Sequence, residues 1–310
     1  MIDISCIIIN YNTSNYTTEA VKSILDFHEN DLSLEIIVVD NCSKIDDYLL
    51  LKESLEQLNN HKVKLYRSRI NTGFGGGNMY GVLQASPSNY YAFINNDTLQ
   101  ISKNCLKRLK EFMVNTPDAA VCSPQMLDQH KNFSVTIDHF SSLKREIIKR
   151  PLLEKLNPKK YLNRKITYTK PTAVHYVQGS FLFVDAKEFD AVGGFDTNIF
   201  LYYEESDLCL RLLKERGKKT YLIPDVEYIH YKNASTPRTA LSKTEMKISL
   251  LYTIKKHYGY FAHQLLLNHL RVKYFFSFIV KPKHFYLFKV LLKGGGLNHS
   301  LKLKQKIEEL

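Results

Sequence analysis

Short apolar runs rich in β-branched residues alternate with longer segments in which apolar residues recur every three or four positions. The short runs predict strands buried on both faces, and the periodic segments predict amphipathic helices. The predicted strands cover 4–10, 34–41, 63–68 and 90–97, and the predicted helices cover 13–28, 46–60 and 75–85. Such alternation indicates an α/β fold with right-handed crossovers and a mainly parallel sheet flanked by helices.

The remaining chain divides into segments of different character. Residues 141–170 contain two prolines and many cations, which predicts a mobile basic insertion. Strand and helix return over 173–196, followed by a helix over 204–216 that Gly217 ends and a strand over 218–231. After Pro237 the pattern is helical and basic. We therefore expect one domain over 1–240 and a helical C-terminal region over 241–310.

Polar residues follow each of the first four predicted strands. Any one of them is typical of an ordinary turn. Because the carboxyl ends of parallel strands meet at one edge of a sheet, however, four such groups together predict a ligand site there. These residues are Asn10 and Asn12, then Asp40, then the segment from Asn71 to Gly77 that includes Gly73, and finally Asn95, Asn96 and Asp97.

The formal net charge of +12 is concentrated in two segments. Residues 141–170 carry ten Lys and Arg against two Glu, and residues 271–310 carry nine against two. This distribution indicates two surfaces that face something anionic, and it does not indicate a general polyanion binder.

The cysteines and the N-terminus bear on the compartment. Five widely spaced cysteines without a CxxC pair argue against a disulfide framework and against a zinc site. The N-terminal apolar run turns polar after Ile9, so we predict no signal peptide and expect a reducing cytosol. Lys281 and Pro282 interrupt the most apolar stretch of the tail, so we predict no membrane-spanning helix.

Three carboxylates, Glu204, Glu205 and Asp207, crowd the start of the helix predicted over 204–216. The helix macrodipole favours acids in a first turn, and Asp207 is placed to pair with Arg211 one turn later. That explanation does not require both glutamates, which follow the aromatic run FLYY and should be partly desolvated. Burial and a neighbouring like charge both raise the proton affinity of a carboxylate, as a general base requires.

Six motifs occur in order along the chain: CIIINYN, VVDNCS, NTGFGGGNMYG, AFINNDT, VGGFDTNIFLYYEESDLCLRLLKERGKK and PDVEYIHYKNAS. Taken together, they resemble the motifs of the inverting family 2 glycosyltransferases, and most closely those of the branch of bacterial rhamnosyltransferases with their galactofuranosyl- and hexosyl-transferring relatives. The resemblance covers about residues 3–240 and implies the GT-A nucleotide-diphospho-sugar transferase fold.

The resemblance implies a metal site and a catalytic base. Asp97 matches the last acid of the DxD-type motif, which binds Mg²⁺ or Mn²⁺ between the two phosphates of a nucleotide-sugar, and Asn95 replaces the first acid. His230 matches a further metal ligand. The acidic pair matches the place of the catalytic base, which is Glu-Asp in the family and Glu204-Glu205 here; we favour Glu205 slightly.

Other residues are assigned to the nucleotide-sugar by the same resemblance. Asp40 matches the acid that contacts base or ribose, Asn10 and Asn12 match the base pocket, and Gly179 and Ser180 match the wall of the sugar and acceptor pocket. Arg238 is a candidate phosphate contact. The glycine run through Asn71, Gly73 and Asn78 predicts a strand-to-helix turn whose backbone passes close to the nucleotide, with Gly81 allowing tight packing of the helix.

The basic tail interleaves aromatic and aliphatic residues with cations over 261–293, which is typical of helices at a membrane interface. This predicts a peripheral protein on the cytoplasmic face of a bacterial membrane, attracted by anionic lipid and acting on a lipid-linked glycan. The alternative interpretation is that the same residues form an ordinary helical subdomain with a solvated basic face, or a homodimer contact.

Three alternative functions fit parts of the sequence, and specific residues argue against two of them. A Rossmann dehydrogenase is disfavoured because Asn78 stands where the third glycine of the fingerprint belongs. A sugar nucleotidyltransferase should carry a Gly-rich basic loop after the first strand, where this chain has NYNTSN. A basic binding protein without transferase activity is the third; we expect no nucleic acid partner, because the chain outside the two basic segments is slightly acidic.

The donor remains open among dTDP-rhamnose, which we favour, and UDP-sugars of galactofuranose or another hexose.

Overall fold

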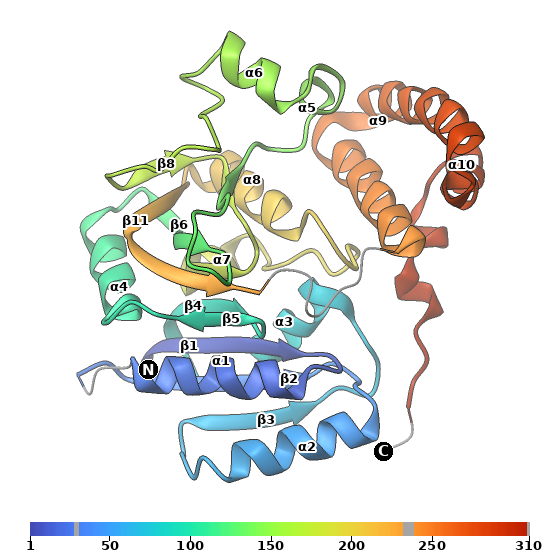
Figure 1. The fold of residues 1–310 in the computed structure, drawn as a ribbon. Helices are drawn as coiled ribbons and strands as arrows, with labels where there is room; N and C mark the ends of the chain where they lie inside the picture. The colour runs from blue at the N-terminus through green and yellow to red at the C-terminus, as the bar shows by residue number, and fades with distance from the viewer. Residues whose placement is uncertain (28–30, 232–238, 309–310) are drawn as a thin grey trace.

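The computed structural model describes residues 1–27, 31–231 and 239–308 of the chain. A nine-stranded sheet lies at its centre, with strand order β3-β2-β1-β4-β10-β6-β11-β5 and with β8 paired to β11 (Figure 1). The strands of this sheet are β1 (Ile2–Asn10), β2 (Leu34–Asp40), β3 (Val63–Arg67), β4 (Ser88–Asn95), β5 (Thr98–Gln100), β6 (Ala119–Leu127), β8 (Thr172–Val174), β10 (Phe181–Asp185) and β11 (Lys219–His230). A separate two-stranded sheet pairs β7 (Ile137–Asp138) with β9 (Tyr176–Val177).

The first half of the sheet is parallel, as predicted. Strands β3, β2, β1 and β4 are all parallel neighbours, whereas β10 runs antiparallel to both β4 and β6. The reversal places the beginning of β10 beside the end of β4, where the Asn95 amide donates to the Ser180 carbonyl at 2.9 Å. Two segments 85 positions apart therefore meet at the carboxyl edge of the sheet.

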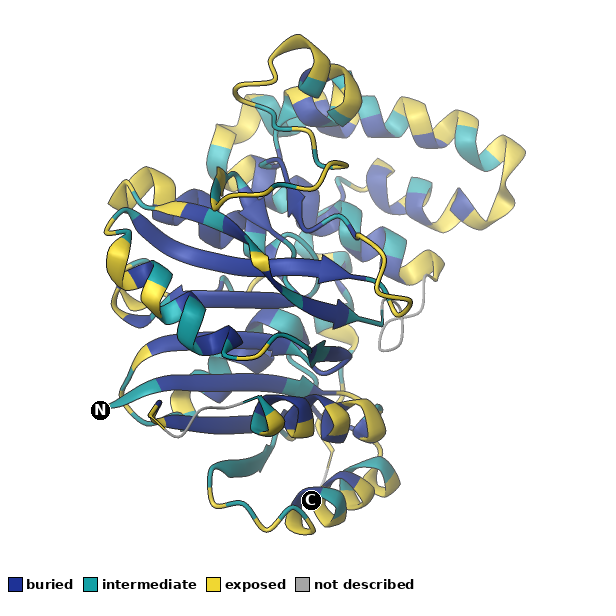
Figure 2. Ribbon diagram, turned by 60° about the vertical axis from the view of Figure 1, so that its left-hand side comes forward, coloured by how far each residue is buried: buried dark blue, intermediate teal, exposed yellow. Residues whose placement is uncertain are grey.

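Helices cover both faces of the sheet, and the strands between them are buried (Figure 2). Apolar residues of α1, α2 and α4 pack with Ile4 and Ile8 on one face, and those of α3, α7 and α8 pack with Ile7 and Phe93 on the other. Alternate residues of β1 thus serve opposite cores, as the period of a strand requires. These helices are α1 (Ser14–Asp26), α2 (Ile45–Glu56), α3 (Gly73–Gln84), α4 (Cys105–Asn115), α7 (Ala186–Ala191) and α8 (Glu204–Arg216).

Gly81 and Gly217 behave as the sequence predicts. A Cβ at Gly81 would lie 2.5 Å from the Ile7 side chain, so its absence lets α3 pack closely on β1. Gly217 ends α8 with a left-handed φ of 66°, a conformation that glycine adopts without a steric penalty.

The basic segment 141–170 contains the short helices α5 (Leu143–Ile148) and α6 (Arg150–Leu156). Three of its arginines, Arg145, Arg150 and Arg164, pair with Asp138 on β7. Arg145 is buried. These ion pairs attach the segment to the two-stranded sheet, and whether it moves stays a prediction.

The C-terminal region is helical and packs against the rest of the molecule. It contains α9 (Ala240–Val280), which bends at Gly259, then η1 (Pro282–His284), α10 (Phe285–Leu292), η2 (Leu297–His299) and η3 (Leu301–Lys304). The two halves of α9 and α10 share a core of their own that includes Leu250, Leu266 and Leu291. None of the helices in the described ranges is both long and apolar enough to cross a membrane.

Candidate active site

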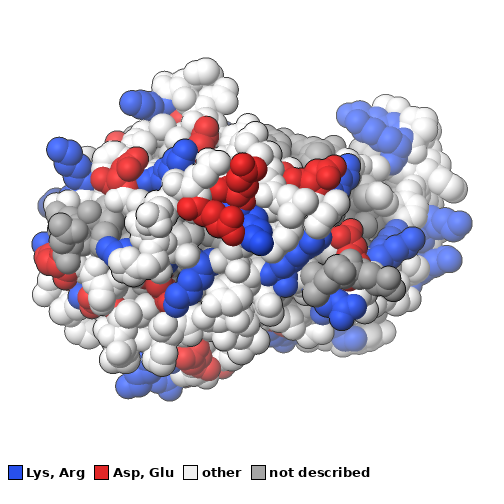
Figure 3. All heavy atoms as spheres, turned by 90° about the horizontal axis from the view of Figure 1, so that it is seen from below, with Lys and Arg blue, Asp and Glu red and all other residues white. Residues whose placement is uncertain are grey.

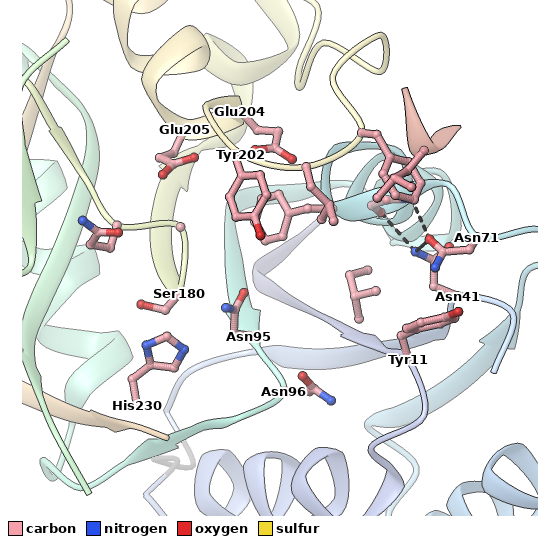
Figure 4. A pocket seen from close by; sticks show the side chains of 18 of the residues that line it. Tyr11, Asn41, Asn71, Asn95, Asn96, Ser180, Tyr202, Glu204, Glu205 and His230 are labelled. Carbon is pink, nitrogen blue, oxygen red and sulfur yellow. Dashed lines mark hydrogen bonds between the residues drawn. The ribbon is translucent and has the colours of Figure 1, made fainter. Parts of the chain in front are cut away.

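A cavity of about 450 Å³ opens at the carboxyl ends of β1 and β4, beneath the start of α8 (Figure 4). Its lining comes from segments spread over the whole chain. The residues are Ile9, Tyr11, Asn41, Asn71, Gly73, Phe74, Asn95, Asn96, Met126, Gln178, Gly179, Ser180, Phe200, Leu201, Tyr202, Glu204, Glu205, His230, Leu301 and Gln305. A mostly apolar cavity of this size, with a few convergent polar groups, is typical of a small-molecule site.

A strained turn brings the two glutamates to this cavity. Tyr202 and Tyr203 both adopt left-handed φ angles, 75° and 76°, immediately before α8. Such angles are rare for bulky residues and cost free energy that the surrounding structure must supply. The turn allows α8 to begin at the pocket, so that both Glu204 and Glu205 point into it (Figure 4).

The glutamates differ sharply from Asp207 in their electrostatics. Burial, and next the charge of Glu205, raise the pKa of Glu204 well above its usual range, and its Oε1 has no hydrogen-bond partner in the described structure. Burial also raises the pKa of Glu205 to about 7. Glu205 is the more accessible of the two to solvent, and it faces the pocket.

Asp207 has a different function in the same helical turn. It forms the predicted ion pair with Arg211 at 2.8 Å, and it also lies 2.7 Å from both Lys256 and His257 on α9. Burial alone would raise the pKa of Asp207, but the hydrogen bond from His257 and the two cations outweigh burial and lower it to about 2. Asp207 thus stays ionised and links α8 to the C-terminal region.

His230 at the end of β11 lines the pocket, and it meets Asp97, which is buried beside it and lies outside the lining. His230 Nε2 lies 3.1 Å from Asp97 Oδ1, and the Tyr231 amide donates to the Asp97 carbonyl. His230 Nδ1 is buried and has no partner within the part of the chain that is described. A carboxylate beside an imidazole with an unused nitrogen fits a divalent cation.

This pair could not enclose a cation by itself. No group of three or more His, Cys, Asp or Glu with metal-binding geometry occurs among the described residues. An ion at Asp97 and His230 would need further oxygen ligands from phosphate and water, which is how Mg²⁺ is commonly held. Asn95 and Asn96 both line the pocket, and the Asn96 side-chain amide also donates to Thr13 and Thr17 and so anchors the β4–β5 turn to α1.

Asn41 is a pocket residue that sequence reasoning missed. Its side-chain amide donates to the Gly73 carbonyl at 3.0 Å and to Asn71 Oδ1 at 3.2 Å, and its oxygen accepts from Thr72 (Figure 4). These bonds fix the loop that precedes α3. The available signal was its position, one residue beyond Asp40 at the end of β2.

Four residues predicted to contact the nucleotide lie outside the pocket lining. Asn10 donates to Asp40 at 2.9 Å, and both side chains are buried. Asn78 donates to the Phe74 carbonyl, and Asn12, with a left-handed φ of 55°, accepts from the Lys44 amide. In the structure these side chains support the loops that form the pocket, so a direct contact with nucleotide stays a prediction for each.

Gly73, Gly179 and Ser180 do line the pocket. Gly73 has a φ of 75°, and a Cβ there would stand 2.0 Å from the Phe200 carbonyl oxygen, so glycine is required where α3 meets the loop before α8. Ser180 Oγ lies 2.8 Å from the hydroxyl of Tyr228. Arg238 falls outside the described residues.

The C-terminal segment unexpectedly reaches the pocket. Leu301 and Gln305 contribute to its lining, and the Glu308 amide then donates to the Arg69 carbonyl on the far side. Upstream, Ser300 Oγ donates to the buried carboxylate of Glu245 at 2.7 Å. The chain after α10 therefore crosses from α9 to the loop following β3.

This sheet order, with a pocket at the carboxyl ends of its strands, defines a GT-A glycosyltransferase fold, and solved structures support it. The chain is similar to GalNAc-T7 with UDP, GalNAc and Mn²⁺ (TM-score 0.60, 13% identity, 82% of this chain and 48% of that one). It is also similar to the mannosyltransferase PcManGT from Pyrobaculum calidifontis in complex with GDP-Man and Mn²⁺ (TM-score 0.57, 14% identity, 83% and 66%).

The family follows from the sequence. Residues 5–185 match the model of glycosyl transferase family 2, and the chain belongs to that family. It is 27% identical to rhamnosyltransferase WbbL of Escherichia coli K12 over 270 residues, which cover 84% of this chain and 94% of that protein. Over 94 residues, 30% of each chain, it is 34% identical to an N-acetylglucosaminyl-diphospho-decaprenol L-rhamnosyltransferase of Mycobacterium tuberculosis. The chain is thus a glycosyltransferase with rhamnosyltransferases among its relatives.

Proposed function

We propose that the protein is a metal-dependent inverting transferase that moves rhamnose from dTDP-rhamnose to a lipid-linked glycan. The observation that carries the proposal is that Glu205, whose pKa lies near 7, and His230 line the same pocket, with the Asp97 carboxylate 3.1 Å from His230 Nε2. A base and a candidate phosphate-metal site are the two elements that direct displacement at an anomeric carbon requires.

The chemistry follows from the positions of these groups. Glu205 accepts the proton of an acceptor hydroxyl while the hydroxyl oxygen bonds to the anomeric carbon. The bond from that carbon to the diphosphate oxygen breaks on the opposite face, so the configuration inverts and a nucleoside diphosphate leaves. Asp97 and His230 would hold Mg²⁺ or Mn²⁺, which supplies positive charge for the departing diphosphate.

Glu204 supports this reaction without exchanging a proton in it. Burial, and next the charge of Glu205, raise the pKa of Glu204 well above its usual range, so an ionised Glu205 favours a protonated Glu204. A neutral Glu204 leaves the pocket with one negative base instead of two mutually repelling charges.

The choice of rhamnose and of a lipid acceptor is supported by relatives. The Escherichia coli relative is named a rhamnosyltransferase, and the mycobacterial one acts on a sugar-diphospho-decaprenol according to its name. A hexose donor remains the alternative, since a hexosyltransferase, Agl10 of Haloferax volcanii, is 26% identical over 218 residues that cover 69% of this chain and 62% of that protein.

Peripheral attachment at the inner face of the cell membrane belongs to the same proposal. The last turns of α9 expose large apolar side chains, with Phe276 63% and Val280 76% exposed, next to Lys281 and Lys283 in the turn to α10. Figure 3 shows basic side chains predominating at the end of the molecule where Figure 1 places α9 and α10, while the rest of that face mixes both signs. Exposed aromatics beside lysines favour an anionic interface.

The test is a donor panel. Purified protein is incubated with Mg²⁺ or Mn²⁺, each nucleotide-sugar and a lipid-linked sugar extract, and released nucleoside diphosphate is measured. Release with dTDP-rhamnose that chelator and the Asp97→Asn variant abolish would support the proposal. Release that persists fully in chelator would overturn the proposed metal dependence. Release with a UDP-hexose alone would show that this UDP-hexose, and not dTDP-rhamnose, is the donor.

A further inference from the structure

Cations gather between α5 and α9, outside the pocket lining: Arg145 is buried, Lys243 and Lys247 are half-buried, and Lys149 and Lys273 are exposed. The cluster, called here the α5–α9 cation cluster, comprises Arg145, Lys149, Lys243, Lys247 and Lys273. Lys243 and Lys247 are one turn apart on the first half of α9, and Lys273 comes from its second half. Three separate segments therefore contribute positive charge to one place.

The cluster lacks a matching set of acids. Within the described structure, Glu146 is the acid that acts on these lysines, at 3.9 Å from Lys247 and 3.7 Å from Arg145. Asp138, which also pairs with Arg145, is shared with Arg150 and Arg164. Among the described residues these five cations outnumber the two acids that contact them, so the arrangement leaves positive charge that a bound anion would neutralise.

Individual contacts show that the cations are only partly neutralised. Lys243 Nζ lies 2.8 Å from the ring nitrogen of His284, and this lysine and Lys273 each lie over the Tyr274 ring, at 5.4 and 5.7 Å. Arg145 is 4% exposed, and its Nε has no hydrogen-bond partner in the described residues. Burial, and next the neighbouring Lys273 and Arg145, lower the pKa of Lys247 even though Glu146 opposes the shift.

The cluster lies between the catalytic acids and the apolar turn. On one side, the Arg145 guanidinium lies 5.8 Å from the ring of Tyr203, the residue that directly precedes Glu204. On the other side, Lys243 contacts His284, which lies in the turn with exposed Val280 and Phe285. A molecule reaching from the membrane to Glu205 would pass these cations.

We propose that the α5–α9 cation cluster binds the diphosphate of a lipid-linked acceptor. The ammonium and guanidinium groups suit phosphate oxygens, the acceptor sugar is directed to Glu205, and the prenyl chain leaves toward Val280 and Phe285. This inference rests on the proposed function for the identity of the acceptor.

Farnesyl diphosphate serves as the probe, since it carries the diphosphate and prenyl chain without the sugar. It is titrated calorimetrically into the full-length protein in the presence of chelator, which suppresses phosphate binding at Asp97 and His230. We expect Lys247→Gln and Lys273→Gln each to weaken binding about tenfold, the loss typical of one charged hydrogen bond. Lys187→Gln, an exposed lysine on α7, is the matched control and should bind as wild type does.

Two further measurements separate the alternatives. Without probe, Lys247→Gln should melt at the same temperature as wild type or higher, because it removes repulsion; a lower melting temperature with unchanged farnesyl diphosphate affinity would make the lysine structural and overturn the proposal. Vesicles of phosphatidylcholine with and without phosphatidylglycerol test whether the anion that the cluster binds is a lipid headgroup. If the variants lose binding to the anionic vesicles but retain farnesyl diphosphate affinity, the diphosphate assignment is wrong.

The binding readout does not depend on sugar transfer. If no nucleotide-sugar is turned over by wild type while the probe still binds through Lys247 and Lys273, the proposed donor chemistry fails and the anion site stands. If transfer proceeds and the variants leave both probe affinity and acceptor KM unchanged, the anion site fails and the proposed function stands.

Discussion

Gly179 lies beside the carboxylate of Glu205: a Cβ added at Gly179 would stand 3.8 Å from Glu205 Cδ and from Oε2. Because this is ordinary van der Waals distance, Gly179→Ala should fold and retain activity. Gly179→Leu would extend into the space beside the proposed base and should lower kcat about a hundredfold, the cost typical of misplacing a reacting group by about 1 Å. Steady-state kinetics of the two variants check this, and equal activity would place the acceptor elsewhere.

The pH dependence follows from the pKa of about 7 at Glu205. A base must be deprotonated to act, so kcat/KM should rise as the pH increases toward about 7 and level off above it. Glu204→Gln should leave this midpoint nearly unchanged, because Glu204 is already protonated there. A profile that is flat between pH 5 and 8 would contradict a base that titrates near pH 7. Loss of the rise in Glu204→Gln would instead make Glu204 the base.

Gly73 and Gly193 form a matched pair for stability. Both have left-handed φ angles, 75° and 76°, but a Cβ at Gly193 meets nothing within 4 Å whereas one at Gly73 would collide with the Phe200 carbonyl. Backbone strain of about 1 kcal/mol is common to both alanine variants. We expect Gly73→Ala to lose clearly more free energy of unfolding than Gly193→Ala in denaturant titrations, and equal losses would contradict the close contact.

The C-terminal segment offers a second matched pair. Leu301 lines the pocket, while Leu303, two residues on, is 69% exposed. Leu301→Ala should therefore raise the KM for the donor or the acceptor by about tenfold, the order expected for removing buried apolar contacts, and Leu303→Ala should not. If the two variants have the same KM values, the segment covers the pocket without contacting substrate.

The local pattern of apolar and polar residues predicts much of this fold, because β1 to β4 and α1 to α3 arise from periodicities within single segments. It also predicts the divided roles of the acidic cluster, since Asp207 and Arg211 are one turn apart. It does not predict that β10 runs antiparallel to β4, or that Ser180 meets Asn95, because strand direction depends on partners far along the chain. The left-handed Tyr202 and Tyr203 are equally unexpected, since no local preference favours that conformation.

The pocket residues that the sequence did not predict were missed for the same reason, because their positions depend on partners far along the chain. Asn41 adjoins a predicted site residue, but its bonds are to the loop before α3. Leu301 and Gln305 come from a tail that carries no motif, and they reach the pocket through the packing of α9. Conversely, Asn10 and Asp40 lie at the predicted sheet edge, but their side chains bond to each other.

The central claim is that Glu205 is the base of a glycosyl transfer. The most direct test measures nucleoside diphosphate release by wild type, Glu205→Gln and Glu204→Gln with donor, metal and acceptor at pH 7.5, near the expected plateau. The account predicts that Glu205→Gln loses about 10²- to 10⁴-fold in kcat, the usual contribution of general base catalysis, while donor affinity is kept and Glu204→Gln retains most of the activity. Full activity of Glu205→Gln would contradict the account.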